Sequence, residues 1–260
     1  MKNKKLIINA DDFGLTPGVT QGIIEAHKQG IVTSTTALTV SDAFLPSMET
    51  VKQQAPSLGI GVHLTLTLNK HQPILPREVV PSLVDEEGYF WNQKEYLSKV
   101  NVEEVYMEWE AQILHFLKSG QAPTHIDSHH NVHGGSEGLV GVALKLARKF
   151  KLPIRNSIRK PEDSGLVDYY NQISTTDKMM GDFYDQDATM KQLIQNFDTV
   201  QESDLETFEM NCHPAFIDAK LMETSSYNMR RMEELDILTS TKAKEELSKR
   251  NILLTNYHML

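Results

Sequence analysis

The sequence predicts an α/β protein built as an irregular (β/α) barrel of about seven parallel strands. Short apolar or β-branched segments alternate with amphipathic segments along the 260 residues, as strands and helices do around a parallel sheet. Glycine and proline mark several segment ends, and polar side chains gather where the predicted strands end. A doubly wound open sheet is the alternative arrangement. We expect one domain that spans residues 1–260, because a chain of this length can bury a sufficient core.

The first elements begin and end at clear signals. Residues 5–10 form a short apolar strand. A helix then begins after Thr16, because threonine caps a helix and Pro17 suits its first turn, and Gly30 ends it. The elements predicted next are a β-branched strand over 34–40, a helix over 41–53 and a strand over 58–66.

The same alternation continues to the end of the chain. The elements predicted there are a helix over 102–117, a strand over 124–128, a helix over 139–150, a strand over 152–155, a helix over 189–200, a strand over 207–212, one or two helices over 228–249 and a strand over 252–255.

Two segments, 69–94 and 159–186, interrupt the alternation. Long insertions of this kind are binding loops or lids, or else tolerated surface decoration. The first contains Tyr89-Phe90-Trp91, which can stack on a sugar ring or pack the loop itself.

Composition narrows the classes of partner. The chain has 26 Lys and Arg against 35 Asp and Glu, a formal charge of −9, without a basic block. This balance disfavours nucleic acid or a membrane surface as the partner. The apolar runs are too short for a signal peptide or a membrane span. The single cysteine, Cys212, suits a reducing compartment, so we expect a cytoplasmic protein.

Titratable side chains stand where the predicted strands end. In a parallel barrel these ends meet at one face, where the active sites of such barrels are built. The residues at these ends are Asp11 and Asp12, His63, the run His125-x-Asp127-x-His129-His130, and His213 after Cys212.

The histidine run favours a divalent cation. Side chains alternate along a strand, so His125, Asp127 and His129 point to one side. Such a row is costly to bury unpaired, but it is stable when imidazoles bind a cation and a carboxylate orients one of them. A hydrogen-bonded surface cluster is the alternative interpretation, and the further histidines elsewhere in the chain favour the metal.

The other residues at the strand ends allow a chemical and a structural interpretation. Asp11 and Asp12 are adjacent and cannot point the same way in a strand, so one can bind a metal while the other moves a proton. Asp-Asp-Phe-Gly is equally suitable as a turn. His63 lies in an apolar strand, as a core histidine does. His213 is held extended by Pro214, which suits a general acid or base and also an ordinary strand exit.

Taken in order, five motifs resemble the YdjC/ChbG family of carbohydrate deacetylases, nearest to its chitooligosaccharide (chitin disaccharide) deacetylase branch. The resemblance runs from about residue 5 to the end of the chain. The motifs are Asn9-Ala10-Asp11-Asp12-Phe13-Gly14, Gly30-Ile31-Val32-Thr33-Ser34-Thr35-Thr36-Ala37, Gly61-Val62-His63, Thr124-His125-Ile126-Asp127-Ser128-His129-His130, and Cys212-His213-Pro214-Ala215-Phe216-Ile217-Asp218.

The resemblance implies a barrel of the glycoside hydrolase/deacetylase type and a role for each site residue. His63 and His129 match the family's metal ligands. By analogy with NodB-type deacetylases, Asp12 completes the metal site and Asp11 is the base. His213 matches the histidine that protonates the leaving amine. A substrate contact is implied for Asp127, and a contact with the substrate or with Asp11 for Arg155. Asn131 departs from the pattern, because close relatives often have a third consecutive histidine there, and no role is implied for it.

The resemblance also implies a cofactor, a substrate and an assembly. The divalent metal ion is Mg²⁺ by resemblance, although Zn²⁺ and other ions also suit nitrogen and oxygen ligands. The substrate is a small N-acetylated oligosaccharide such as chitobiose, which loses its acetyl group, and the protein forms a homodimer. The alternatives are a metal-dependent phosphoester hydrolase or sugar isomerase on the same barrel, and a non-catalytic metal- or sugar-binding regulatory module.

Overall fold

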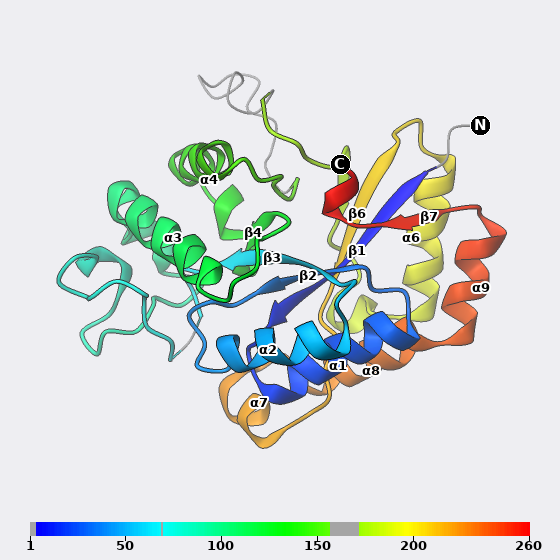
Figure 1. The fold of residues 1–260 in the computed structure, drawn as a ribbon, viewed down its shortest axis with the longest axis horizontal. Coiled ribbons are helices and arrows are strands. Elements are labelled where there is room, and N and C mark those ends of the chain that lie inside the picture. The colour runs from blue at the N-terminus through cyan, green and yellow to red at the C-terminus, as the bar shows by residue number, and fades with distance from the viewer. Residues whose placement is uncertain (1–3, 69, 157–171) are drawn as a thin grey trace.

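A computed structural model describes residues 4–68, 70–156 and 172–260. Its strands form one parallel sheet that curls into part of a barrel (Figure 1). The strands pair in the order β4-β3-β2-β1-β6-β5, and β7 pairs with the start of β1. The strands are β1 (Lys5–Phe13), β2 (Ser34–Ala37), β3 (Gly59–Leu64), β4 (Ile126–Ser128), β5 (Lys178–Met180), β6 (Thr207–Cys212) and β7 (Leu253–Thr255). The predicted irregular barrel of about seven parallel strands is confirmed.

Helices lie around the outside of the curled sheet. In Figure 1, α1, α2 and α8 run along its lower side, α3 and α4 flank the end with β4, and α6 and α9 flank the opposite end. The helices are α1 (Pro17–Gln29), α2 (Phe44–Gln54), α3 (Val102–Leu117), α4 (Glu137–Phe150), α6 (Met190–Glu202), α7 (Ala219–Thr224), α8 (Met229–Thr239) and α9 (Thr241–Lys249). Single 3₁₀ turns are η1 (Pro81–Leu83), η2 (Tyr96–Ser98), η3 (His129–Gly134), η4 (Asp185–Asp187) and η5 (Tyr257–Met259).

Most predicted elements lie within a few residues of their expected bounds. The Thr16 hydroxyl accepts the backbone N–H of Val19 at the start of α1, as its capping role requires. The segment predicted as a strand over 152–155 makes only one bridge, from Ile154 to β4. The chain instead has β5 at 178–180, inside the second predicted insertion. Residues 159–171 of that insertion lie outside the described part of the chain.

Strand β1 is the centre of the sheet and of the core. Leu6 and Ile8 are fully buried, and the strand pairs with β2 on one side and β6 on the other. Helix α1 packs closely on the loop that follows β6. A Cβ atom on Gly22 would lie 2.4 Å from the Ala215 Cα, so the close approach requires glycine here. This contact fixes the loop that begins at His213.

The first insertion packs on itself and on α3. Phe90 is buried, and the Trp91 Nε1–H donates to the carbonyl oxygen of Ser82 at 2.8 Å. From α3, the buried Glu108 accepts the backbone N–H groups of Ile74 and Leu75. Phe90 and Trp91 therefore pack the loop, which is one of the two roles that the sequence allowed.

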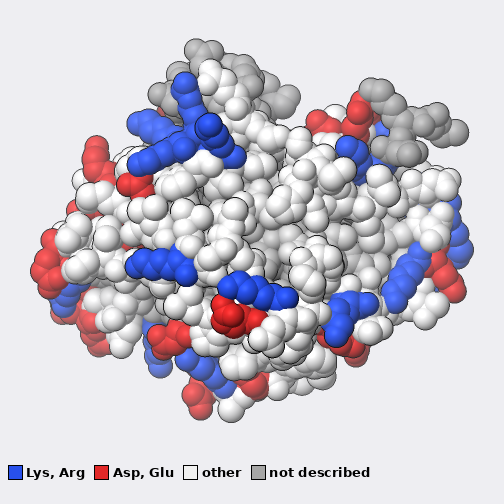
Figure 2. Space-filling view, in the orientation of Figure 1, with Lys and Arg blue, Asp and Glu red and all other residues white. Residues whose placement is uncertain are grey.

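The surface is mixed in charge. Figure 2 shows basic and acidic side chains along the left, lower and right parts of the visible face, a largely uncharged middle, and one basic group at the upper left, in the region of α4. In the part of the chain that the structure describes, no helix combines the length and the apolar character that a membrane crossing needs.

Candidate active site

Three side chains, two from strands β1 and β3 and one from the residue that follows β4, meet at the carboxyl end of the sheet. The Asp12 Oδ1 atom lies 2.9 Å from His129 Nδ1 and 3.4 Å from His63 Nε2. One ligand atom from each of the three residues lies within 4.8 Å of the others. The fold thus brings together the carboxylate and two imidazoles that the resemblance implied as metal ligands.

The backbone at Asp12 explains how two adjacent aspartates serve different partners. Asp12 has a φ of 69°, in the left-handed region that aspartate tolerates better than most residues. The pairing of β1 with β2 is irregular between Ala10 and Phe13. Asp12 therefore turns toward the histidines, while Asp11 faces Arg155.

Strand register orients His63. His63 of β3 stands directly opposite Asp127 of β4, and its Nδ1 lies 2.7 Å from Asp127 Oδ1. The Nε2 atom then faces Asp12, which is the arrangement that carboxylates impose on metal-binding histidines. Burial opposes charge on this ring, but Asp127 and Asp12 outweigh it and raise the pKa of His63 to about 10. A divalent cation held by the Nε2 atom would take the place of this proton, so its affinity would fall at low pH.

Arg155 neutralises the deeper carboxylates. Its guanidinium donates to both oxygens of Asp11, at 2.8 and 2.6 Å, and to Glu209 at 2.8 Å. It also lies 2.9 Å from Asp127. Burial opposes the charge of Asp11, yet Arg155 outweighs it and holds the pKa of that carboxyl well below its usual value. Asp11 and Asp127 form a second potential ligand group with His63, but Arg155 already satisfies their charge.

His213 lies beside Asp11 at the end of β6. Its Nε2 is 3.9 Å from Asp11 Oδ2, and its Nδ1 is 3.9 Å from Glu234 Oε1 of α8. The backbone N–H of His213 donates to Glu234 Oε2 at 2.5 Å. Burial lowers the pKa of His213 to about 4 and raises that of Glu234 to about 7. His213 is therefore neutral near pH 7.

Helix α8 contributes site residues that the sequence did not reveal. The Arg231 guanidinium donates to Asp12 Oδ2 at 2.6 Å, and Glu234 contacts His213. Both are buried, and their spacing of three residues puts them on one face of the helix. The signal in the sequence that could have revealed them is a pair of charged residues, Arg231 and Glu234, on the face of the helix that is otherwise apolar.

Two tyrosines complete the wall around His213. The rings of Tyr184 and Tyr227 stack with centroids 4.4 Å apart, and each lies edge-on to the His213 ring. Tyr227 donates its hydroxyl to Glu234. Neither tyrosine was among the predicted site residues.

The predicted row of three side chains on β4 is divided in the structure. Asp127 and His129 reach the cluster, whereas the buried His125 stacks on Tyr257 with ring centroids 3.7 Å apart. The ring of His125 packs on the C-terminal turn η5 and is not part of the Asp12-His63-His129 group. The sequence left the roles of His125, His130 and His133 open. The exposed His130 bonds Thr67, and the buried His133 bonds Ser128.

The other predicted residues also have defined places. Arg155 and Asp127 are fully buried or nearly so, bonded to one another and to their neighbours. Their role in substrate binding stays a prediction, as do the catalytic roles of Asp11 and His213.

Comparisons with known proteins agree with this arrangement. The family described as YdjC-like protein matches residues 5–249. A carbohydrate deacetylase from Enterococcus faecalis is 58% identical over the whole of this chain and 99% of its own length. A solved structure from Enterococcus faecalis, named as a proposed cellobiose-phosphate cleavage protein, has a TM-score of 0.96, 58% identity and 99% coverage of both chains. A family 4 acetyl xylan esterase from Clostridium thermocellum, solved with a cobalt ion, shares the fold, with a TM-score of 0.51 and 11% identity over 98% of this chain and 89% of that one.

Proposed function

We propose, from the premise that this chain belongs to the YdjC-like family of carbohydrate deacetylases, that it hydrolyses the acetamide group of an N-acetylated sugar at a metal site. The observation that carries the proposal is the Asp12-His63-His129 cluster, which lies beside Asp11 and His213. Metal ligands, an ionised carboxylate and an imidazole are the groups that amide hydrolysis requires.

The residues fit a divalent cation. Asp12, His63 and His129 supply one oxygen and two nitrogen ligands, and Asp127 stands behind His63. A divalent cation held there supplies Lewis acidity to the amide carbonyl and lowers the pKa of bound water. The resemblance implies Mg²⁺, whereas two imidazoles favour Zn²⁺ or another transition ion, because Mg²⁺ prefers oxygen ligands.

Asp11 and His213 move the proton in the proposed reaction. Asp11 is ionised because Arg155 keeps its pKa low, so it can accept a proton from the attacking water. The same low pKa means that Asp11 gives the proton up readily. His213 Nε2 lies 3.9 Å away and is neutral near pH 7, so it can receive this proton and pass it to the departing nitrogen. The products are acetate and the free amine.

Mass spectrometry tests the proposal. Metal-loaded protein incubated with di-N-acetylchitobiose is expected to convert it to a product about 42 Da lighter, with acetate released in equal amount. His213→Ala is the matched variant, and we expect it to lose most of this activity. Zn²⁺, Co²⁺, Mn²⁺ and Mg²⁺ are compared separately. Intact acetyl groups with every ion would overturn the proposal.

A further inference from the structure

The exposed ring of Tyr184 lies beside the candidate proton donor. Tyr184 is 47% exposed, and its ring stands edge-on to His213 with centroids 5.4 Å apart. Its stacking partner Tyr227 lies 5.4 Å from the guanidinium of Arg231, which donates to Asp12 of the Asp12-His63-His129 cluster. Among the described residues the Tyr184 hydroxyl has no hydrogen-bond partner, so both the ring and its polar tip are open to a ligand.

Tyr227 supports the other face of this ring. The two rings stack at 4.4 Å with an angle of 20° between their planes. Tyr227 is itself fixed, because its hydroxyl donates to Glu234 and accepts the backbone N–H of Asp185 at 3.0 Å. The guanidinium of Arg231 lies 5.4 Å from the Tyr227 ring centroid. Tyr184 is thus held in place before any ligand arrives.

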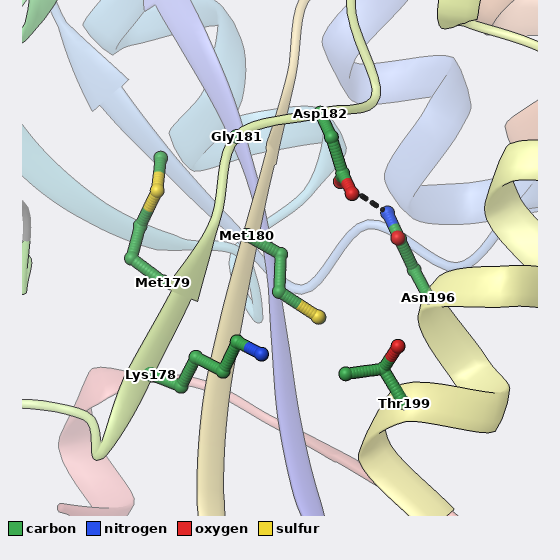
Figure 3. Close-up of a pocket in the computed structure, with 7 residues that line it drawn as sticks. All are labelled: Lys178, Met179, Met180, Gly181, Asp182, Asn196 and Thr199. Atoms are coloured by element: carbon green, nitrogen blue, oxygen red, sulfur yellow. Dashed lines mark hydrogen bonds between the residues drawn. The ribbon is translucent and has the colours of Figure 1, made fainter.

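The chain that leads to Tyr184 is also anchored. Figure 3 shows Gly181 and Asp182 after β5, with Asp182 bonded to Asn196 of α6. The Nδ2 of Asn196 donates to Asp182 Oδ1 at 2.8 Å, and Gln192 of α6 donates to Oδ2 at 3.0 Å. Asp182 and Asn196 also line a pocket of about 360 Å³ between β5 and α6.

We propose that Tyr184 is the platform on which the pyranose ring of the substrate stacks, an inference that rests on the proposed function. A pyranose presents a face of C–H groups that packs on an aromatic ring, while its hydroxyl groups stay hydrated or bonded at the edge. A sugar on Tyr184 lies next to His213, so its acetylated nitrogen is within reach of the group that protonates it. Tyr184 therefore selects ring-bearing amides over small ones. At the alternative platform, Phe90 is buried and Trp91 is bonded to Ser82, so both rings pack the loop.

Kinetics of matched variants test this assignment. Tyr184→Ala is expected to raise KM for di-N-acetylchitobiose roughly tenfold with kcat changed less than threefold, since the lost contact is made by the bound sugar. Tyr184→Phe keeps the stacking face, so its KM is expected within threefold of the wild-type value. Tyr89→Ala is the control for the other loop, and its KM is expected to be unchanged. Tyr184→Leu repeats the test if the alanine variant unfolds.

Binding separates failure of this inference from failure of the proposed function. In a His213→Ala background, calorimetry is expected to show roughly tenfold weaker binding of the disaccharide when Tyr184→Ala is added. Wild-type protein that removes no acetyl group overturns the proposed function. Turnover in the wild type, with KM and Kd unaffected by Tyr184→Ala and Tyr184→Leu, overturns the platform alone. A fall in kcat at constant KM also overturns it, because Tyr184 would then act through His213.

Discussion

His129 Nδ1 lies 2.9 Å from Asp12 Oδ1, although 117 positions separate the two residues in the chain. The contact depends on the parallel sheet, which brings the ends of β1 and β4 to the same face. The same carboxylate also faces His63 Nε2 at 3.4 Å. One aspartate therefore links the chain's first strand to both histidines, and the site exists only in the folded protein.

Replacing Asp12 should remove the metal site. Asp12→Asn is expected to weaken the binding of a divalent cation by more than about 100-fold, since loss of a group behind a ligand already costs 10- to 100-fold. Asp11→Asn is the matched control. Because Asp11 pairs with Arg155 outside the Asp12 cluster, this variant should bind metal within about tenfold of the wild type while losing turnover. Calorimetric titration with Zn²⁺ and Mg²⁺ measures the metal affinity of both variants. A larger loss in Asp11→Asn than in Asp12→Asn would place the cation in the Asp11-His63-Asp127 group.

Replacing Asp127 should affect the metal through His63. Asp127→Asn is expected to reduce metal affinity by about 10- to 100-fold, because the His63 Nδ1 loses the acceptor that orients it. Glu209→Gln is the control, because Glu209 also binds Arg155 but does not contact His63. The same titration checks both variants. Equal losses in the two would show that Arg155, and not His63, carries the effect.

The sequence predicted the site residues at the ends of strands better than it predicted the helix residues and rings that pack around them. Residues such as Asp12 and His213 stand where apolar strand patterns stop, so local pattern and the geometry of parallel sheets were sufficient. Strand β5 was missed because it has three residues and begins with the exposed Lys178. Arg231 lies on a helix whose sequence does not specify which strand it packs against. The sequence left the role of His125 open, because alternation fixes the side of the strand on which its ring lies but not the neighbour, here Tyr257, on which the ring stacks.

The ionisation of Glu234 should shape the pH profile. Burial raises the pKa of Glu234 to about 7 against the opposing effects of Tyr227, His213 and Arg231, while Asp11 adds to the rise. Above that pH its negative charge, 3.9 Å from His213 Nδ1, favours the protonated imidazole that the reaction passes through. We therefore expect kcat to rise as pH increases through about 7.

Glu234→Gln tests this origin of the pH dependence. The variant is neutral at every pH, so its kcat should show no rise near pH 7 and should be roughly tenfold below that of the wild type at pH 8. Glu108→Gln is the control, because burial also raises the pKa of Glu108 to about 7, but Glu108 binds the first insertion. If the rise in kcat near pH 7 persists in Glu234→Gln and disappears in Glu108→Gln, the titrating group is Glu108 and the prediction is wrong.

Arg155 should contribute more to stability than a surface arginine. Arg155→Ala leaves the buried carboxylates of Asp11, Asp127 and Glu209 without their cation, and we expect a loss of about 3–5 kcal/mol in the free energy of unfolding. Arg250→Ala removes ion pairs to Asp198 and Glu246 near the surface and should cost less than about 1 kcal/mol. Urea denaturation followed by circular dichroism compares the two. Similar losses would contradict the view that Arg155 balances a buried cluster.

The Asp12-His63-His129 site is tested by titrating metal-stripped protein with a divalent cation while measuring acetate released from di-N-acetylchitobiose. If the Asp12-His63-His129 cluster is the catalytic metal site, activity should rise in proportion to bound cation and level off near one ion per chain. The Asp12→Asn variant should stay inactive throughout the titration. Full activity in stripped protein, or activity restored to the Asp12→Asn variant at the same cation concentration, would show that this cluster is not the catalytic metal site.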